Sequence, residues 1–403
     1  MLQRSIESLV TIALSISPIV LLKGARQVGK STLSTHLNLH YVVLDDISVR
    51  ISVKEDPIRF IQMLPKPVCI DEIQKAPELL EALKLYVDAN RRNGDFLLTG
   101  SANILDMKQA KDTLAGRIIE LELYPLSLKE KSQDSQSNCI DLLFNHTFES
   151  KRIAYNDIVD QIIRGGYPET LRLNTPMERR LWFSSYISTY VERDARDLAE
   201  LRDIDSYFRF LNIVAPRSTQ MLVKSDLAKE VGVRVETIEN YLTILEQTFQ
   251  VKILRPYFEN IGKQFVKSPK LYLNDTGLMS YFLKITNIES FEESMYKGAL
   301  VETLVGNELM KHISFSETST DIYHYRTNDK KEIDFILKRQ DKIIAIEVKA
   351  SMSVSKEDFK HISDYQKISK NEVTGIVFYM GEHILPFGDE ASKRYALPLS
   401  IFF

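Results

Sequence analysis

The apolar residues near the start of the chain gather in short unbroken runs. Four such runs, at residues 19–22, 41–44, 68–70 and 96–98, end in glycine or polar residues. Runs of this length are typical of strands that are buried on both faces. Residues 30–37 lie between the first two runs and form a predicted helix. We therefore predict an α/β fold with a parallel sheet for this part of the chain.

The loop after the first run carries a complete G-x-x-x-x-G-K-[ST] pattern. Its glycines let the backbone turn tightly and direct N–H groups at phosphate oxygens, and the following helix adds its positive end. Lys30 would pair with the β- and γ-phosphates of ATP, and the Ser31 hydroxyl would bind Mg²⁺. The residues predicted to contact the nucleotide are Gly24, Ala25, Arg26, Gln27, Val28, Gly29, Lys30, Ser31 and Thr32.

Polar residues follow the later runs. Asp71 and Glu72 end the third predicted strand, where Asp71 would hold Mg²⁺ and Glu72 would polarise the attacking water. Ser101 follows the fourth strand and is predicted to sense the γ-phosphate. For Arg117 two roles stay open, a contact to phosphate, in cis or from a neighbouring subunit, or a tie between its strand and the sheet.

Four segments together resemble a known family. They are "KGARQVGKSTL", "CIDEIQKAPELLEALK", "FLLTGSANILDMKQAKDTLAGRIIELELYPLSLKE" and "GGYPE". They resemble the AAA-type ATP-binding proteins of bacteria and archaea that carry a C-terminal domain of unknown function. The resemblance implies a P-loop ATPase core with Lys30, Ser31, Asp71 and Glu72 in the usual roles, and it supplies no substrate.

Residues 222–275 have the pattern of a winged helix. Two predicted helices flank a turn at Gly232, and two strands follow around residues 260–262. The second helix displays Glu236, Glu239 and Glu246, which would be repelled by DNA phosphates. The wing is more basic and carries Lys263, Lys267 and Lys270. Direct contact with DNA and a packing role both stay open.

The C-terminal part has carboxylates in a recognisable order. A helix carries Glu302, a predicted hairpin carries Asp334, and the strand "KIIAIEVKASM" carries Glu347 and Lys349. This order resembles the PD-(D/E)XK nuclease superfamily. The resemblance implies that Asp334 and Glu347 hold one or two Mg²⁺ ions, that Glu302 adds a carboxylate, and that Lys349 orients or activates water. A domain of the same fold that binds without cutting is the alternative.

Length and these patterns predict four domains in 403 residues. They are an AAA-type P-loop ATPase domain at 1–135, a helical linker or lid at 136–200, a winged-helix domain at 201–287 and an α/β nuclease-like domain at 288–403. A net charge of -3 requires any basic surface to be local. Two cysteines favour a reducing cytoplasm, and the longest apolar run, interrupted by Pro18, is too short to span a membrane.

These predictions describe a cytoplasmic ATPase, with ATP and Mg²⁺ as cofactors, whose nucleotide state controls the winged-helix and nuclease-like parts. DNA or RNA would be the partner, and a trans role for Arg117 would require a homo-oligomer. Two alternatives stay open: an ATP-dependent signalling or scaffold switch with an inactive C-terminal domain, and a DNA-binding regulator.

Overall fold

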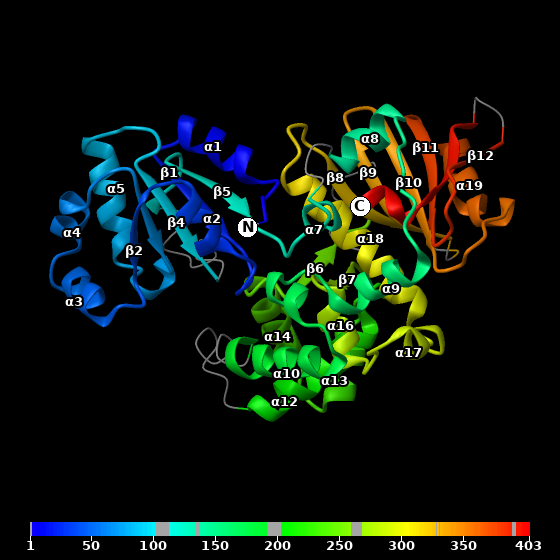
Figure 1. The fold of residues 1–403 in the computed structure, drawn as a ribbon, viewed down its shortest axis with the longest axis horizontal. Coiled ribbons are helices and arrows are strands. Elements are labelled where there is room, and N and C mark those ends of the chain that lie inside the picture. Colours follow the sequence, from blue (N-terminus) through cyan, green and yellow to red (C-terminus); the bar gives the residue numbers. More distant parts are fainter. Residues whose placement is uncertain are drawn as a thin grey trace. The chain divides into compact units, whose positions relative to one another are not determined.

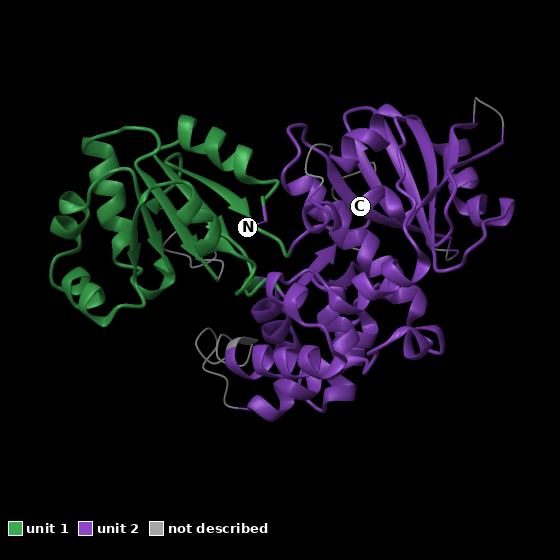
Figure 2. Cartoon of the chain, viewed as in Figure 1, with its two compact units in different colours: residues 1, 3–125, 247–249 green, residues 2, 126–246, 250–403 purple. Residues whose placement is uncertain are grey.

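The computed structural model describes residues 2–101, 113–133, 138–191, 203–258, 268–327, 329, 331–388 and 392–403 (Figure 1). They form two compact units, residues 3–125 with 247–249 and residues 126–246 with 250–403 (Figure 2). The last three predicted domains fall almost wholly in the second unit, and the predicted boundary at residues 135 and 136 stays a prediction. The boundaries within that unit stay predictions.

The first unit is built on a parallel sheet in the order β2-β3-β4-β1-β5. The strands are β1 (Ile19–Lys23), β2 (His40–Val43), β3 (Val68–Asp71), β4 (Phe96–Gly100) and β5 (Ile118–Glu122). The central strands β1, β3 and β4 are almost wholly buried, as expected for unbroken apolar runs between layers of helices. The predicted parallel sheet is confirmed.

The helices of the first unit precede β1 or lie in the connections between its strands. They are α1 (Glu7–Ile16), α2 (Lys30–His36), α3 (Ile47–Glu55), α4 (Pro57–Met63), the single turn η1 (Ile73–Lys75) and α5 (Leu79–Ala89). The apolar face of α5, with Leu79, Leu83 and Val87, packs into the same core as Ile70 and Leu98 of the sheet. This core fixes the strand ends from which the phosphate loop and Asp71 project.

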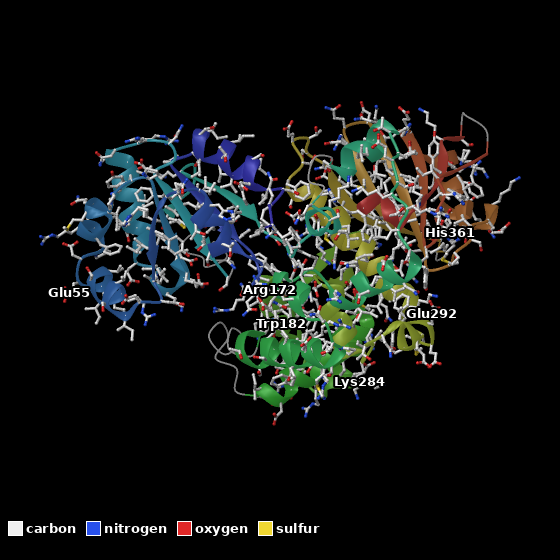
Figure 3. All side chains as sticks on the ribbon, in the orientation of Figure 1. Glu55, Arg172, Trp182, Lys284, Glu292 and His361 are labelled. Carbon is white, nitrogen blue, oxygen red and sulfur yellow. The ribbon has the colours of Figure 1, made fainter. Side chains whose placement is uncertain are left out.

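The second unit begins with a helical part. Its elements are α7 (Leu128–Lys131), α8 (Cys139–Asn145), α9 (Tyr155–Arg164), η3 (Pro168–Arg172), α10 (Pro176–Tyr186), η4 (Ile187–Val191), α12 (Ile204–Val214), η5 (Ala215–Arg217), α13 (Lys224–Val231), α14 (Val235–Gln247), α16 (Thr276–Phe282) and α17 (Ile288–Glu292). Trp182 of α10 and Lys284 after α16 belong to this part, as does Arg172 of η3 (Figure 3).

The predicted helix-turn-helix segment forms α13 and α14, joined at Gly232. Gly232 has a φ of 79°, the left-handed conformation that commonly ends a helix. The short antiparallel pair β6 (Val251–Leu254) and β7 (Lys270–Leu273) follows. Lys263 and Lys267 lie outside the described residues. Lys270 opens β7 and is only 1% exposed, so of the two alternatives left open for the wing, its burial fits packing and leaves it unavailable for contact with DNA.

The C-terminal part contains a mixed sheet in the order β12-β13-β11-β10-β9-β8. Its elements are α18 (Lys297–Ser314), β8 (Asp321–Arg326), β9 (Glu332–Arg339), β10 (Lys342–Lys349), η6 (Lys356–Phe359), α19 (Lys360–Ile368), β11 (Glu372–Tyr379), β12 (Leu385–Phe387), β13 (Arg394–Pro398) and η8 (Leu399–Phe402). β8, β9 and β10 are antiparallel neighbours, whereas β10, β11 and β13 run parallel.

Helices α18 and α19 cover this sheet. Gly306 of α18 lies against Phe335 of β9, while Ile362 of α19 packs with Ile336 and Ala345, which belong to the other face of the strands. Glu347 shares this second face with Ala345, two residues before it on β10. Both cysteines of the chain, Cys69 and Cys139, are buried thiols. Among the described helices, none combines the length and apolar character that a membrane crossing requires.

Candidate nucleotide site and C-terminal carboxylate cluster

The phosphate loop lies between the end of β1 and the start of α2. Gly24 has a φ of 153°, and a Cβ at this position would lie 2.2 Å from the carbonyl oxygen of Leu123. Gly29 precedes α2 with a φ of 101°. Side chains rarely adopt these conformations, so glycine is required at both ends of the loop. The sequence pattern therefore has a direct conformational cause.

Lys30 is folded back over its own loop. The side chain is buried, and Nζ donates hydrogen bonds to the carbonyl oxygens of Gly24 at 2.9 Å and Ala25 at 2.8 Å. The ammonium thus stands inside the loop that would surround the phosphates, and its pairing with the β- and γ-phosphates stays a prediction.

Arg4, which no sequence motif marks, holds the loop from the outside. Its Nη1 donates to the carbonyl of Val28 at 2.7 Å, and its Nη2 donates to that of Tyr124 at 2.8 Å. The residue lies 24 positions before Val28. No local pattern marks such a contact.

Asp71 collects three hydroxyl groups at the end of β3. Ser31 Oγ donates to Asp71 Oδ2 at 2.9 Å, and the hydroxyls of Tyr41 and Thr99 also donate to this carboxylate. Burial and the bond to Asp71 raise the pKa of Tyr41 above its ordinary value. The structure therefore brings Ser31 and Asp71 together as predicted, with Tyr41 and Thr99 as additional partners.

The Ser31–Asp71 pair fits a magnesium site of the P-loop type. Mg²⁺ in such sites takes one hydroxyl and one carboxylate from the protein, and its other ligands are phosphate oxygens and water. A dense carboxylate cage is not needed. In the part of the chain that the structure describes, no three His, Cys, Asp or Glu side chains converge as a metal-binding group.

Glu72 has an unusual backbone conformation next to this site. Its φ of 59° and ψ of 44° are left-handed, which is uncommon for a residue other than glycine and is often found at functional sites. The carboxylate accepts hydrogen bonds from Gln74 Nε2 and, at 3.2 Å, from Ser101 Oγ. Glu72 and Ser101 are thus neighbours, and Gln74 links them.

Arg117 lies away from the phosphate loop. Ile118, which follows it, pairs with Ile19 at the start of β1, whereas the loop follows the last residue of that strand. Five residues of strand span roughly 15 Å. The Arg117 guanidinium pairs with Asp88, with Nε 2.6 Å from Oδ1 and Nη2 3.0 Å from Oδ2. A contact to nucleotide in the same chain does not fit this placement, while a trans contact stays a prediction.

In the second unit, Lys270 stands at the centre of a carboxylate cluster. Its Nζ lies 3.0 Å from Glu302, 2.6 Å from Glu332 and 3.4 Å from Asp334. Burial by itself would lower the pKa of Lys270, but the three carboxylates raise it above its ordinary value. Tyr272 adds a hydrogen bond from its hydroxyl to Glu302 at 2.7 Å. We call Lys270, Glu302, Glu332 and Asp334 the Lys270 cluster.

The predicted nuclease-like residues adjoin the Lys270 cluster. Ile346 of β10 pairs with Phe335 of β9, so Glu347 and Asp334 come next on these neighbouring strands. The Val348 N–H donates to Asp334 Oδ2 at 2.9 Å, and Lys349 Nζ lies 3.1 Å from Glu347 Oε1. Burial, followed by the charge of Asp334, raises the pKa of both Glu302 and Glu347.

The four predicted residues therefore come together, but the positive charge of Lys270 compensates the negative charges of Glu302 and Asp334. Glu302 and Asp334 share the Lys270 ammonium, and Glu347 pairs with Lys349. The other oxygen of Glu347, Oε2, is buried without a hydrogen-bond partner in the described structure. Carboxylate oxygens are the ligand type that a hard cation takes, but among the described residues these carboxylates do not converge as a group of three that could hold a metal ion. The ammonium group of Lys270 already occupies the place between Glu302 and Asp334 that such a cation would take.

Comparisons with known proteins support the interpretation of the first unit as a P-loop ATPase domain. Residues 17–132 match the model of a family described as an AAA domain. This match, the parallel sheet and the glycine-lined loop identify an AAA-type P-loop ATPase domain. Residues 155–289 and 297–402 match two families that are both described as domains of unknown function.

Relatives extend over most of the chain. An uncharacterized protein of Mycobacterium tuberculosis is 28% identical over 382 residues, covering 94% of this chain and 80% of its own. An uncharacterized protein of Haemophilus influenzae is 28% identical, covering 78% and 76%. A solved Walker-type ATPase of Pyrococcus abyssi aligns with 70% of this chain and 96% of its own at 14% identity and a TM-score of 0.45.

Proposed function

We propose that the first unit binds Mg·ATP and hydrolyses it. The observation that carries this proposal is the meeting of Lys30 and the Ser31–Asp71 pair at the start of α2. The match to the AAA domain family over residues 17–132 supports it.

Each group at the site has a distinct task. Lys30 leaves the carbonyls of its own loop for the β- and γ-phosphates, because a charged phosphate oxygen is the stronger acceptor. Ser31 and Asp71 would hold Mg²⁺, which supplies neutralisation of phosphate charge when bound. Glu72 orients the attacking water, and Ser101 beside it responds to the γ-phosphate.

The test compares Lys30→Ala with a matched surface variant, Lys54→Ala. Lys54 is exposed on α3 of the same unit. We expect Lys30→Ala to lose binding of a fluorescent ATP analogue at least tenfold and to release phosphate at the background rate. Lys54→Ala should behave as the wild type. Wild-type binding and turnover in a folded Lys30→Ala protein would overturn the proposal.

A second candidate function belongs to the C-terminal sheet: metal-dependent cleavage of DNA or RNA. The observation that favours it is the buried, unpartnered Oε2 of Glu347 beside Asp334 and Lys349. A buried carboxylate oxygen without a donor is costly, and a bound cation would relieve that cost. Lys349 is then placed to orient a water near Glu347.

Whether the Lys270 ammonium stays between Glu302 and Asp334 decides whether the domain cleaves nucleic acid or only binds a partner. Cleavage would require a divalent cation to share or displace the ammonium between Glu302 and Asp334, and in this proposal the nucleotide state of the ATPase controls that exchange. If Lys270 keeps its place, the domain binds a partner without cutting, as a signalling or scaffold module would.

A nuclease assay separates the two. Wild type, Asp334→Ala and Lys349→Ala would be incubated with DNA or RNA in Mg²⁺ or Mn²⁺, with and without ATP. The control is Asp341→Ala, at the exposed turn between β9 and β10. We expect cleavage by wild type and control, and a loss of at least tenfold in both site variants. No cleavage by the wild type under any of these conditions would exclude the nuclease and leave the binding role.

Homo-oligomerisation would give Arg117 its trans role, and we propose it as the condition for full ATP turnover. Turnover per subunit should then rise with protein concentration and should fall in Arg117→Ala. A constant rate per subunit, with Arg117→Ala as active as the wild type, would leave Arg117 as the tie between β5 and Asp88 that its contacts describe.

A further inference from the structure

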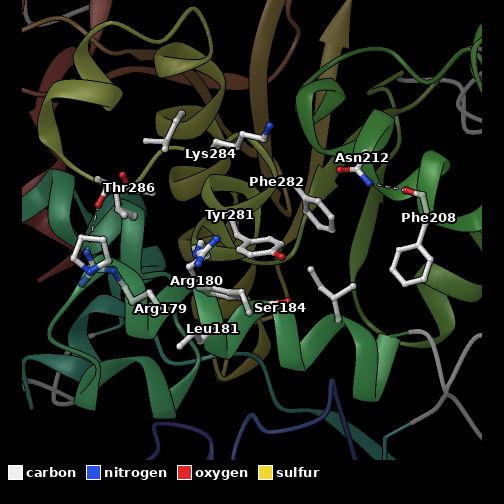
Figure 4. Close-up of a pocket in the computed structure, with 16 residues that line it drawn as sticks. Arg179, Arg180, Leu181, Ser184, Phe208, Asn212, Tyr281, Phe282, Lys284 and Thr286 are labelled. Carbon is white, nitrogen blue, oxygen red and sulfur yellow. Dashed lines mark hydrogen bonds between the residues drawn. The ribbon is translucent and has the colours of Figure 1, made fainter.

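The helical part of the second unit contains a cavity of about 670 Å³ (Figure 4). Helix α10 forms one wall, α16 and the turn after it form another, and α9, η4 and α12 contribute the rest. Its size is that of a small-molecule site. It lies within a single unit and contains no residue of the phosphate loop or of the Lys270 cluster.

The described lining of this cavity is positively charged. It includes the cations Arg179, Arg180 and Lys284, and it includes no Asp or Glu. The chain as a whole carries a net charge of -3, so this concentration of positive charge is local. A cavity with charges of one sign and apolar walls favours a ligand of the opposite sign.

Among these cations, Arg179 gives the strongest indication that the cavity binds an anion. It is only 8% exposed, and its buried Nη1 has no hydrogen-bond partner in the described structure. Nη2 reaches the carbonyl of Thr286 at 3.5 Å, the limit of a hydrogen bond. A buried guanidinium that lacks an acceptor is costly, so an anion in the cavity would be stabilised there.

The nearest carboxylates are engaged elsewhere. Glu178 accepts the backbone N–H groups of Asn174 at 2.7 Å and Thr175 at 2.8 Å, which caps α10. Asp160 pairs with Arg164 at 2.5 Å. Neither carboxylate forms a hydrogen bond or ion pair with Arg179 in the described structure. The missing acceptor is therefore not supplied by a neighbouring side chain.

The remaining walls are apolar and aromatic. Phe208, Tyr281 and Phe282 line the cavity from α12 and α16, and Leu181 lies at its edge with 59% exposure. Aromatic walls suit a flat apolar body, since rings stack or pack edge to face. Asn212 and Ser184 add polar groups that can fix its orientation.

We propose that this cavity binds a small amphipathic anion, whose carboxylate or phosphate head pairs with Arg179 and whose ring-bearing apolar body lies against Tyr281 and Phe282. Arg180 and Lys284 attract the anion electrostatically. The site is separate from the ATP site, so its ligand is a second small molecule and not the nucleotide at Lys30.

The probe is anilinonaphthalene sulfonate, an aromatic anion that fluoresces on binding, used with the full-length protein. Phenylnaphthylamine has a similar body without the charge and serves as the neutral counterpart. We expect saturable binding of one sulfonate per chain at this site and at least tenfold weaker binding of the amine. Competition by naphthoate and by naphthyl phosphate then distinguishes a carboxylate head from a phosphate head.

Four variants locate the binding. Arg179→Met should weaken sulfonate binding at least tenfold, and Ser184→Trp, a substitution at an exposed position on the rim, should block it. Arg172→Met is the matched control, because Arg172 is an exposed arginine of the neighbouring η3 with its side chain 81% exposed. Lys30→Ala should bind as the wild type, which separates this site from the ATP site.

The proposal fails if the sulfonate does not saturate, if the neutral amine binds as tightly, or if Arg179→Met and Ser184→Trp bind as the wild type does. Should Arg179→Met not fold, Ser184→Trp and Arg180→Met, both at exposed positions, carry the test. Arg180→Met should weaken binding about threefold.

Discussion

Replacing Lys270 by methionine tests the Lys270 cluster directly. Methionine keeps most of the length of the side chain and removes the ammonium. Three carboxylates that lie within 3.4 Å of Nζ, those of Glu302, Glu332 and Asp334, then lose their shared cation. Because Lys270 is 1% exposed, water cannot easily replace it. Loss of one partner from a buried ion pair typically costs about 3–5 kcal/mol.

We therefore expect Lys270→Met to lower the free energy of unfolding of the second unit by about 3–5 kcal/mol, measured by urea denaturation. The control is Lys224→Met, which removes a surface ion pair with Glu239. That pair has a comparable distance of 2.8 Å, but both side chains are about half exposed. Its loss should cost less than about 1 kcal/mol.

Divalent cations provide the second readout. With the ammonium gone, Mn²⁺ or Mg²⁺ can enter between Glu302 and Asp334. At ten times its dissociation constant, a bound ion adds about 1.4 kcal/mol of stability. We expect this gain in Lys270→Met and not in the wild type without nucleotide. If Lys270→Met costs no more than Lys224→Met and no metal stabilises it, the reasoning about the cluster is refuted.

Three further predictions concern single residues. Glu72→Gln should retain ATP binding while its turnover falls roughly 10²–10⁴-fold, as expected for loss of a general base; equal turnover with intact binding would remove Glu72 from the mechanism. Gly24→Ala should destabilise the first unit by roughly 1–3 kcal/mol and abolish nucleotide binding, because its Cβ meets Leu123, and a melting curve like that of the wild type would contradict this. Burial lowers the pKa of His312 from 6.5 to about 3, so the unfolded chain takes up a proton that the folded chain refuses, and stability falls as the pH falls through that interval. Between pH 7 and pH 5 the wild type should lose about 2 kcal/mol more than His312→Asn, whose amide oxygen can still accept the Cys139 N–H; parallel losses in urea titrations would show that His312 is not the cause.

The phosphate loop was predictable because its information is local. Eight consecutive residues specify the turn, the donors and the helix start, and the strand before them is a continuous apolar run. The place of Asp71 was also predictable from the sequence, since parallel strands bring their carboxyl ends to one edge of the sheet. The contacts of Arg4 and Tyr41 were not predictable from the sequence, because each residue reaches the site from a separate part of the chain and no spacing rule connects it to the phosphate loop.

Arg117 shows a different limit. The sequence showed that Arg117 precedes a strand. It did not show at which end of the sheet that strand begins. The register of β5 against β1 sets it at the end away from the loop. A one-dimensional pattern does not contain this register.

Lys270 marks the boundary between what the sequence determined and what only the tertiary structure decided. The sequence by itself determined the P-loop and the order of Glu302, Asp334, Glu347 and Lys349, because these depend on short patterns and on strand periodicity. It placed Lys270 on a basic wing. The fold instead buries this lysine among carboxylates 32 and 64 positions later in the chain. Charge compensation over such separations depends on which strands and helices pack together, and that is settled only when the whole unit folds.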